Sequence, residues 1–124
     1  MGRQMIKSYR ELLIWQKGII LVKEIYKLTK KFPKTEKFVM SAQMQRAAIS
    51  IPSNIAEGHA RQYSKEFRHF LYIALGSLAE LDTLLIVATE LGYIFKEDLF
   101  EMRTKIEELR KMIYGIVKKL SASN

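Results

Sequence analysis

The chain contains no cysteine, and only two prolines and six glycines occur among its 124 residues. Without cysteine it can carry neither a disulfide framework nor a thiolate metal site. Hydrophobic residues make up 48% of the chain, which is too many for an intrinsically disordered protein. One domain with a single hydrophobic core is therefore expected over residues 1–124.

Long apolar runs are also missing. An uninterrupted run such as residues 19–22 falls far short of the ~20 residues that a membrane span needs. Residues 1–7 lack the apolar stretch of a signal peptide. Together with the lack of cysteine, these absences predict a cytoplasmic protein without a membrane partner.

Positive charge is abundant and unevenly distributed. The net charge is +8 and the isoelectric point is near 9.7. Residues 1–37 hold ten Lys or Arg and three Glu, a net charge of +7, whereas residues 38–95 carry −1 and residues 96–124 carry +2. Six lysines lie close together in the basic segment: Lys23, Lys27, Lys30, Lys31, Lys34 and Lys37. Such a cluster favours RNA or DNA as partner, through phosphate contacts that are largely independent of base sequence.

The lysine cluster does not require a nucleic-acid role. Lysine is common on solvated helix faces, and lysines near a helix C-terminus complement the helix dipole. A role at a membrane surface is disfavoured, because the apolar half of this helix is expected to pack in the core. The partner could instead be another protein, with the charge serving solubility or steering.

Apolar residues recur with helical spacing throughout the chain and predict four helices. The expected ranges are 12–32, 36–59, 64–91 and 96–120. Pro33 ends the first helix, Thr35 is a plausible N-cap of the second, and Gly58 is its natural terminator. Ser64 opens the third helix and Gly92 caps its C-terminus. The fold class is therefore all-α, an antiparallel up-down four-helix bundle.

Two of the helices carry long heptad seams. The seam of the third helix is Phe67, Leu71, Ala74, Leu78, Leu81, Leu85 and Ala88, and that of the fourth is Leu99, Met102, Ile106, Leu109, Ile113, Ile116 and Leu120. The first helix has an apolar arc wide enough to touch two neighbours or another subunit. The third helix carries a second line, Phe70, Ile73, Ser77, Glu80, Leu84, Val87 and Leu91.

A line of polar residues runs along the second helix. Gln43, Arg46, Ser50, Asn54 and Glu57 are spaced three or four apart and share one face. With Glu80, a candidate partner for Arg46, they form what we term the polar seam. Its simplest interpretation is a buried network that fixes helix register or the oligomer, and the alternative is a ligand-binding role.

Sequence signals for catalysis are weak. Glu66 and His69 form a single Glu-x-x-His motif, whereas a di-iron bundle uses two, on separate helices. The sequence has no Gly-rich phosphate loop, no Gly-x-Ser-x-Gly elbow and no His-Glu-x-x-His run. We therefore expect no catalytic residue, no metal and no cofactor.

The chain resembles the small four-helix-bundle family encoded within intervening sequences of bacterial 23S ribosomal RNA genes. The resemblance rests on Gln43, Arg46-Ala47-Ala48, Ser50-Ile51-Pro52, Asn54-Ile55-Ala56-Glu57-Gly58, Gly76-Ser77-Leu78 and Glu80-Leu81. It implies an up-down bundle that assembles into a ring-shaped homopentamer. It also implies kinship with the accessory variability protein of diversity-generating retroelements, which binds nucleic acid and a reverse transcriptase. Gln45 departs from the family pattern, in which a second arginine often precedes the one matching Arg46.

Overall fold

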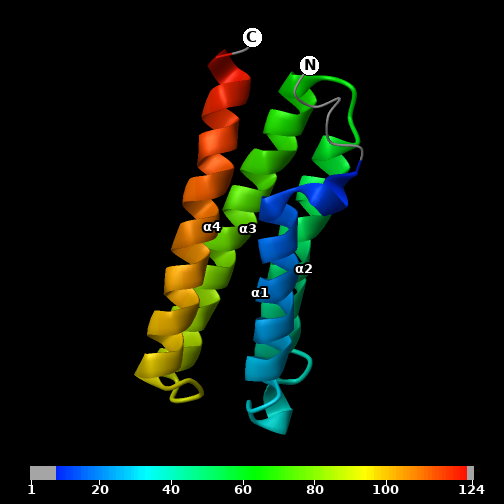
Figure 1. The fold of residues 1–124 in the computed structure, drawn as a ribbon. Coiled ribbons are helices and arrows are strands. Elements are labelled where there is room, and N and C mark those ends of the chain that lie inside the picture. The colour runs from blue at the N-terminus through cyan, green and yellow to red at the C-terminus, as the bar shows by residue number, and fades with distance from the viewer. Residues whose placement is uncertain (1–7, 123–124) are drawn as a thin grey trace.

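A computed structural model describes residues 8–122, which form four long α-helices and no strand. The helices are α1 (Leu13–Thr29), α2 (Met40–His59), α3 (Ser64–Glu90) and α4 (Lys96–Ala122), with short 3-10 helices η2 (Tyr9–Glu11) and η3 (Lys34–Glu36) before α1 and α2. Successive helices run in opposite directions (Figure 1). The predicted all-α, up-down bundle is confirmed. The expectations for residues 1–7 and for residues 123–124 lie outside the described residues.

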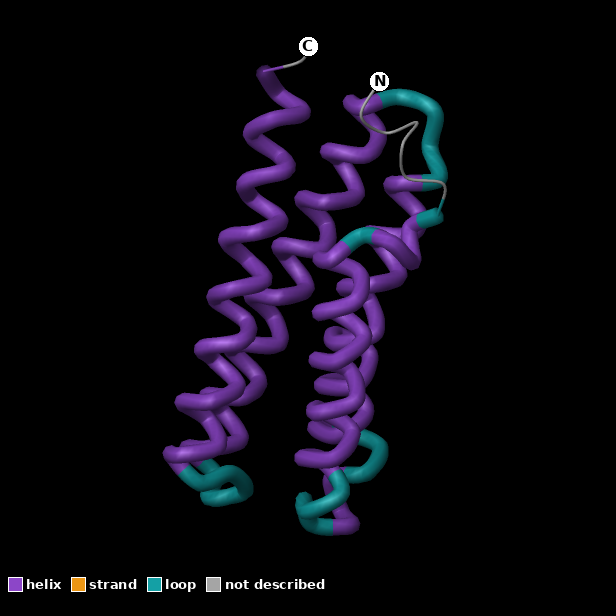
Figure 2. Tube along the Cα trace, viewed as in Figure 1, coloured by secondary structure: helices purple, strands orange, loops and turns teal. Residues whose placement is uncertain are grey.

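Short joints connect the helices (Figure 2). The joint between α1 and α2 and the joint between α3 and α4 lie at one end of the bundle, and the joint between α2 and α3 lies at the other. Among the pairs of α-helices that are in contact, α2–α3 has the most extensive contact and α1–α4 the least extensive. Most of the lysines predicted to bind nucleic acid lie at the end that holds two joints, because they belong to the last part of α1 and to the joint that follows it.

The predicted seams form the core. Every seam residue of α3 is buried, and in α4 Met102, Ile106, Leu109 and Ile113 are buried while Leu99, Ile116 and Leu120 pack partly buried against them. Only part of the apolar arc of α1 is buried. Ile14, Leu21 and Ile25 are buried, whereas Tyr26 is exposed. Pro52 lies inside α2 without ending it, and its side chain packs against Gly18 of α1.

The helix ends at the first joint differ from the sequence prediction. Helix α1 ends at Thr29 rather than at residue 32, and α2 begins at Met40 rather than at residue 36. Thr35 is not the N-cap of α2; it lies in η3, and Val39 occupies the cap position without a side-chain cap. The carboxylate of Glu36 accepts a hydrogen bond from the backbone N–H of Met40 at 3.3 Å. The Glu36 carboxylate therefore satisfies a backbone N–H in the first turn of α2, as the side chain of a capping residue would.

Two glycines have distinct roles. Helix α2 ends at His59, as predicted, but Gly58 lies inside the helix rather than capping its end, and a Cβ at residue 58 would lie 2.7 Å from the Cβ of Phe70. Gly58 is therefore required by the close approach of α2 to α3. Gly92 has a φ of +84° after the end of α3, and the N–H of Tyr93 donates to the carbonyl of Ala88 at 2.9 Å. The predicted glycine cap is confirmed.

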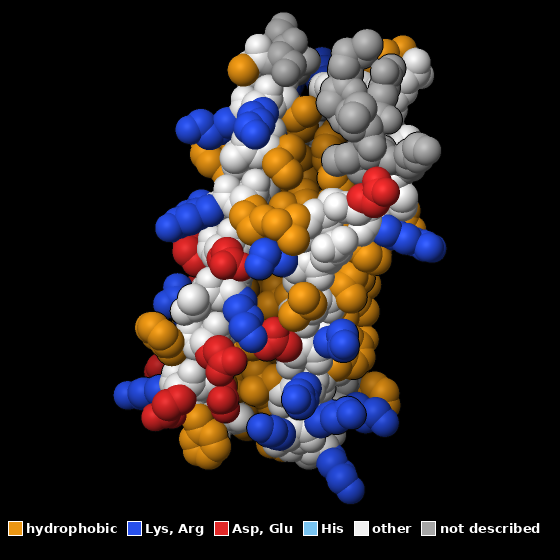
Figure 3. All heavy atoms as spheres, in the orientation of Figure 1, with side chains coloured by type: hydrophobic (Ala, Val, Ile, Leu, Met, Phe, Trp, Pro, Cys, Tyr) orange, Lys and Arg blue, Asp and Glu red, His pale blue; other side chains and the backbone are white. Residues whose placement is uncertain are grey.

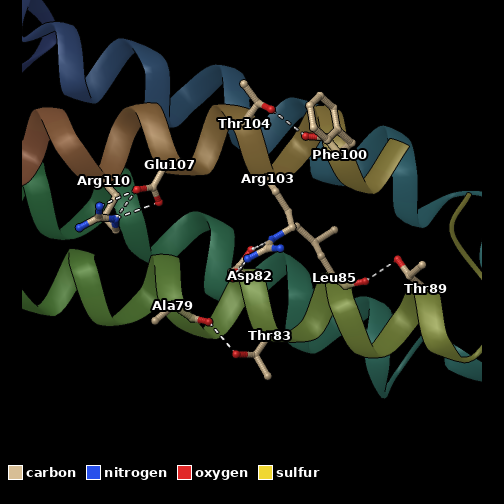
Figure 4. Close-up of polar contacts among 10 residues, drawn as sticks. All are labelled: Ala79, Asp82, Thr83, Leu85, Thr89, Phe100, Arg103, Thr104, Glu107 and Arg110. Carbon is tan, nitrogen blue, oxygen red and sulfur yellow. Dashed lines mark hydrogen bonds and ion pairs between the residues drawn. The ribbon is translucent and has the colours of Figure 1, made fainter. Parts of the chain in front are cut away.

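Ion pairs attach α4 to its neighbours. Arg103 donates two hydrogen bonds to the carboxylate of Asp82 on α3, at 2.8 and 3.2 Å (Figure 4). On the other side, Lys17 of α1 contacts Glu108 at 2.8 Å. These pairs are exposed, so each adds little stability, and the buried seam accounts for most of the attachment.

Helix α3 contains a long apolar stretch. Among residues 8–122 it is the one helix that is long and apolar enough to cross a membrane, judged by length and composition, and 33% of its most apolar window is buried in the bundle. A search for uninterrupted apolar runs misses this property, because Glu80 and Asp82 divide the segment. Core helices of soluble proteins meet the same criterion, so this observation alone assigns no membrane role.

Candidate nucleic-acid interface

The six lysines of the basic segment are all exposed. Lys23, Lys27 and Lys30 recur at spacings of four and three on the side of α1 opposite its buried residues. Lys31 lies in the turn that follows α1, Lys34 in η3, and Lys37 just after η3. We call these six residues the lysine surface. In Figure 3, Lys and Arg side chains gather over this end of α1 and the turn beyond it, without an acidic side chain between them.

The two acidic residues within residues 23–37 are engaged elsewhere. Glu24 pairs with Lys105 of α4 rather than with a lysine of α1, and this contact raises the pKa of Lys105. Glu36 accepts a hydrogen bond from the hydroxyl of Tyr93 at 2.8 Å and another from the N–H of Met40. Within residues 8–122, no lysine of the lysine surface forms an ion pair with an acidic side chain. Its positive charge is therefore locally uncompensated.

The basic residues of α4 have a different environment. Arg110 donates to Glu107, which lowers the pKa of the Glu107 carboxyl and raises the pKa of the Arg110 guanidinium. Asp82 raises the pKa of Arg103 in the same way. Positive and negative side chains alternate along this helix (Figure 3). The lysine surface consequently differs from α4 in the pairing of its charges as well as in their number.

Two exposed aromatic residues border the lysine surface and were not among the predicted site residues. Phe38 follows Lys37 and is 83% exposed, and Tyr26 lies between Lys23 and Lys30 on α1 and is 39% exposed. The ammonium nitrogen of Lys37 lies 5.5 Å from the centroid of the Phe38 ring. The predicted range 36–59 placed Phe38 inside the second helix, where an apolar side chain is expected to pack. Its position directly after the basic segment was the available sequence signal.

The centre of the polar seam connects α2 to α3. The hydroxyls of Ser50 and Ser77 lie 2.7 Å apart, so one donates to the other. Asn54 donates to the carbonyl and the hydroxyl of Ser50, at 2.8 and 2.9 Å. These three side chains are half-buried, and they form the interhelical part of the network that the sequence predicted.

The outer part of the polar seam does not form the expected network in this single chain. Gln43, Arg46, Glu57 and Glu80 are exposed. Glu57 pairs with Arg61 at 2.9 Å, and the expected pair between Arg46 and Glu80 is not formed among the described residues. Both side chains extend from the surface where α2 meets α3, so neither is held by burial.

The residue that departs from the family pattern has its own contact. Gln45 donates from its amide to the hydroxyl of Thr29 at 3.0 Å, and that hydroxyl donates to the carbonyl of Tyr26 at 3.2 Å. Thr29 is buried at the end of α1. Gln45 therefore fixes the start of α2 against the last turn of α1, beside the lysine surface.

Glu66 and His69 are both exposed on the first turns of α3. Within residues 8–122 no group of three or more His, Cys, Asp or Glu side chains is placed to hold a metal ion. Glu66 lies in the first turn of the helix, where a negative charge is stabilised by the helix dipole. This position gives Glu66 a structural role in α3.

Comparison with known proteins places these residues in a family. The family model for the 23S rRNA-intervening sequence protein matches residues 10–115. The chain belongs to this family. The matched range contains the lysine surface, the polar seam and most of all four helices.

A solved structure has the same architecture. The crystal structure of a protein of unknown function from the S23 ribosomal protein family, from Bacteroides thetaiotaomicron, is 28% identical to this family member. The two align with a TM-score of 0.77 over 86% of this chain and 99% of the other. No curated protein matches the chain.

Proposed function

We propose that this protein is a non-enzymatic, cytoplasmic nucleic-acid-binding bundle that contacts the RNA or DNA backbone through the lysine surface. The observation that carries the proposal is that the clustered lysines form no ion pairs among the described residues. Six exposed lysines lie together, while Glu24 and Glu36, the two acids among them, are held by Lys105 and Tyr93. Phosphate groups supply the negative charge that the protein does not.

The chemistry of lysine sets the kind of binding. An ammonium group on a flexible stem is a point charge and lacks the planar fork with which arginine reads guanine. Contacts from Lys23, Lys27 and Lys30 would therefore neutralise phosphates with little preference for base sequence. Affinity would come largely from the release of counterions, so it should fall steeply as salt rises.

Assembly into a ring-shaped homo-oligomer, a homopentamer as the family resemblance implies, is part of the proposal. Support comes from the outer face of the α2–α3 pair, where the apolar Ile73, Val87 and Leu91 are exposed. Arg46 and Glu80, of opposite charge, are exposed on the same pair. Such a face suits a neighbouring subunit, because a carboxylate and a guanidinium from different copies can pair there. A ring would repeat the lysine surface and convert weak phosphate contacts into avidity.

The experiment is a binding titration of the purified protein with structured RNA and with duplex DNA at several salt concentrations. The proposal predicts that the protein binds both at low salt and that affinity falls as salt rises. The slope of log K against log salt should correspond to the release of several counterions. Absence of binding at low salt would reject it.

The rival is a scaffold or accessory subunit whose partner is another protein, such as a reverse transcriptase, without direct nucleic-acid contact. The exposed apolar residues of α3 favour it, because contiguous apolar surface often marks a protein interface. Light scattering separates the two possibilities when it is combined with the titration. A defined oligomer that binds neither nucleic acid at low salt would favour the scaffold.

A further inference from the structure

The lysine surface carries exposed rings as well as exposed charges. Phe38 is 83% exposed in the joint between η3 and α2. Among the described residues its ring stacks on no other aromatic ring, and the ammonium of Lys37 lies 5.5 Å from its centroid. A large ring that is open to solvent beside an uncompensated row of cations combines the two elements of a single-strand binding site: charge that follows the backbone and a surface on which bases stack.

We propose that the lysine surface binds unpaired nucleotides of a single-stranded RNA or DNA segment, with Phe38 stacked on a base and the neighbouring lysines on phosphates. This inference rests on the proposed function of the same surface. A base within a duplex is stacked on both faces and presents its edges in the grooves, so a protein ring cannot reach its face. A base in a single strand has a free face, and any base can use it.

The lysines are placed so that one strand could reach the ring. Lys23, Lys27 and Lys30 extend for ~10 Å along α1 at 1.5 Å per residue, and Lys34 and Lys37 continue beyond the turn to Phe38. A strand that follows these charges arrives at the exposed ring. Hydrophobic side chains lie beside the basic ones at this end of the bundle (Figure 3).

Tyr26 offers a second ring on the same path. It lies three residues after Lys23 and four before Lys30, so it shares their side of the helix. Its exposure of 39% is smaller than that of Phe38. Phe38 is therefore the stronger platform and the residue to test first.

Phe100 provides a matched control. It is 75% exposed on α4, where Arg103 and Arg110 are paired with acids. Loss of either ring removes the same chemical group from the surface of the bundle. Phe38 differs from Phe100 in lying beside the lysine surface, whereas the sequence around Phe100 contains Glu97, Asp98 and Glu101.

The test measures fluorescence anisotropy with two probes, an oligouridine of about 15 nucleotides and an RNA duplex of the same length, over a range of salt concentrations. Phe38→Ala should lower affinity for the single strand by about 5- to 100-fold, leave the slope of log K against log salt unchanged, and leave duplex affinity unchanged. Phe38→Trp should retain single-strand binding. Phe100→Ala should bind like the unsubstituted protein.

Each contrary result has a distinct meaning. Unchanged single-strand affinity in Phe38→Ala would overturn the stacking inference while leaving the proposed phosphate binding intact. Equal weakening for both probes, or a changed mass in light scattering, would overturn it by assigning Phe38 to folding or assembly. Failure of the unsubstituted protein to bind either probe at low salt would overturn the proposed function itself.

Discussion

The carboxylate of Glu36 accepts a hydrogen bond of 2.8 Å from the hydroxyl of Tyr93. Glu36 belongs to the joint between α1 and α2, and Tyr93 belongs to the joint between α3 and α4. Their contact ties together the two joints at one end of the bundle. With the N–H of Met40, it occupies both oxygens of the one acid within residues 30–37, and this acid forms no ion pair with a lysine among the described residues.

This contact predicts a raised pKa for the hydroxyl of Tyr93. The hydrogen bond to Glu36 is the main cause that raises the pKa of Tyr93 above its ordinary value, because the bond exists only while the hydroxyl is protonated. The stabilisation is therefore complete below about pH 10, the ordinary tyrosine pKa, and is lost as pH rises through the higher pKa of the folded protein. NMR of ring-labelled tyrosine should show Tyr93 titrating at lower pH in Glu36→Gln. An identical titration in both proteins would contradict the contact.

Gly58 and Gly76 should respond in opposite ways to alanine. A Cβ at residue 58 would lie 2.7 Å from the Cβ of Phe70, whereas a Cβ at residue 76 meets nothing within 4 Å. Gly58→Ala should lower the free energy of unfolding by about 1–3 kcal/mol, and Gly76→Ala should raise it by about 0.5–1 kcal/mol. Urea denaturation measures both. Destabilisation by Gly76→Ala would mean that another chain approaches α3 closely at that residue.

The bond between Ser50 and Ser77 should contribute measurably to packing of α2 on α3. Ser77→Ala leaves a half-buried hydroxyl of Ser50 without its partner across the interface. We expect a loss of about 1 kcal/mol in the free energy of unfolding. Thr83→Ala is a suitable control, since its hydroxyl bonds within its own helix and is exposed. Equal losses in both variants would show that the interhelical bond has no special contribution.

The architecture could be predicted because buried apolar residues repeat with the period of a helix. The seam from Phe67 to Ala88 fixed the position and the buried face of α3 in advance. Helix ends were harder, because they depend on single contacts between distant residues. Nothing near Thr35 in the sequence indicates that Glu36 caps Met40, or that Gly58 is needed against Phe70.

The candidate surface was predictable in its charges and not in its pairings. Clustering of the lysines was evident from composition along the chain, since Lys23 to Lys37 are close in sequence. The partner of Glu24 is Lys105, which lies 81 positions away in the sequence. Patterns of neighbouring residues cannot predict such a pair. The opposite error occurs at Arg46. Glu80 was predicted to be its partner, and this ion pair is not formed among the described residues of the single chain.

Arg46 provides a prediction that separates folding from assembly. Because its side chain is exposed and makes no ion pair among residues 8–122, Arg46→Ala should change the free energy of unfolding of the single chain by under about 0.5 kcal/mol. If the α2–α3 face joins subunits, the same variant should reduce the mass measured by light scattering. A loss of several kcal/mol in a monomeric sample would instead mean that Arg46 is part of the folded core network.

The lysine surface is tested most directly by comparing two triple variants of equal net charge. One carries Glu at Lys27, Lys30 and Lys31 of the lysine surface, and the other carries Glu at Lys96, Lys111 and Lys118 of α4, which are also exposed. Affinity for RNA is measured against salt, with helical content by circular dichroism as the folding control. We predict that the first variant loses binding and most of its salt dependence, while the second retains most of both. Equal loss in the two variants would contradict a dedicated surface, because net charge rather than the lysine surface would then determine binding.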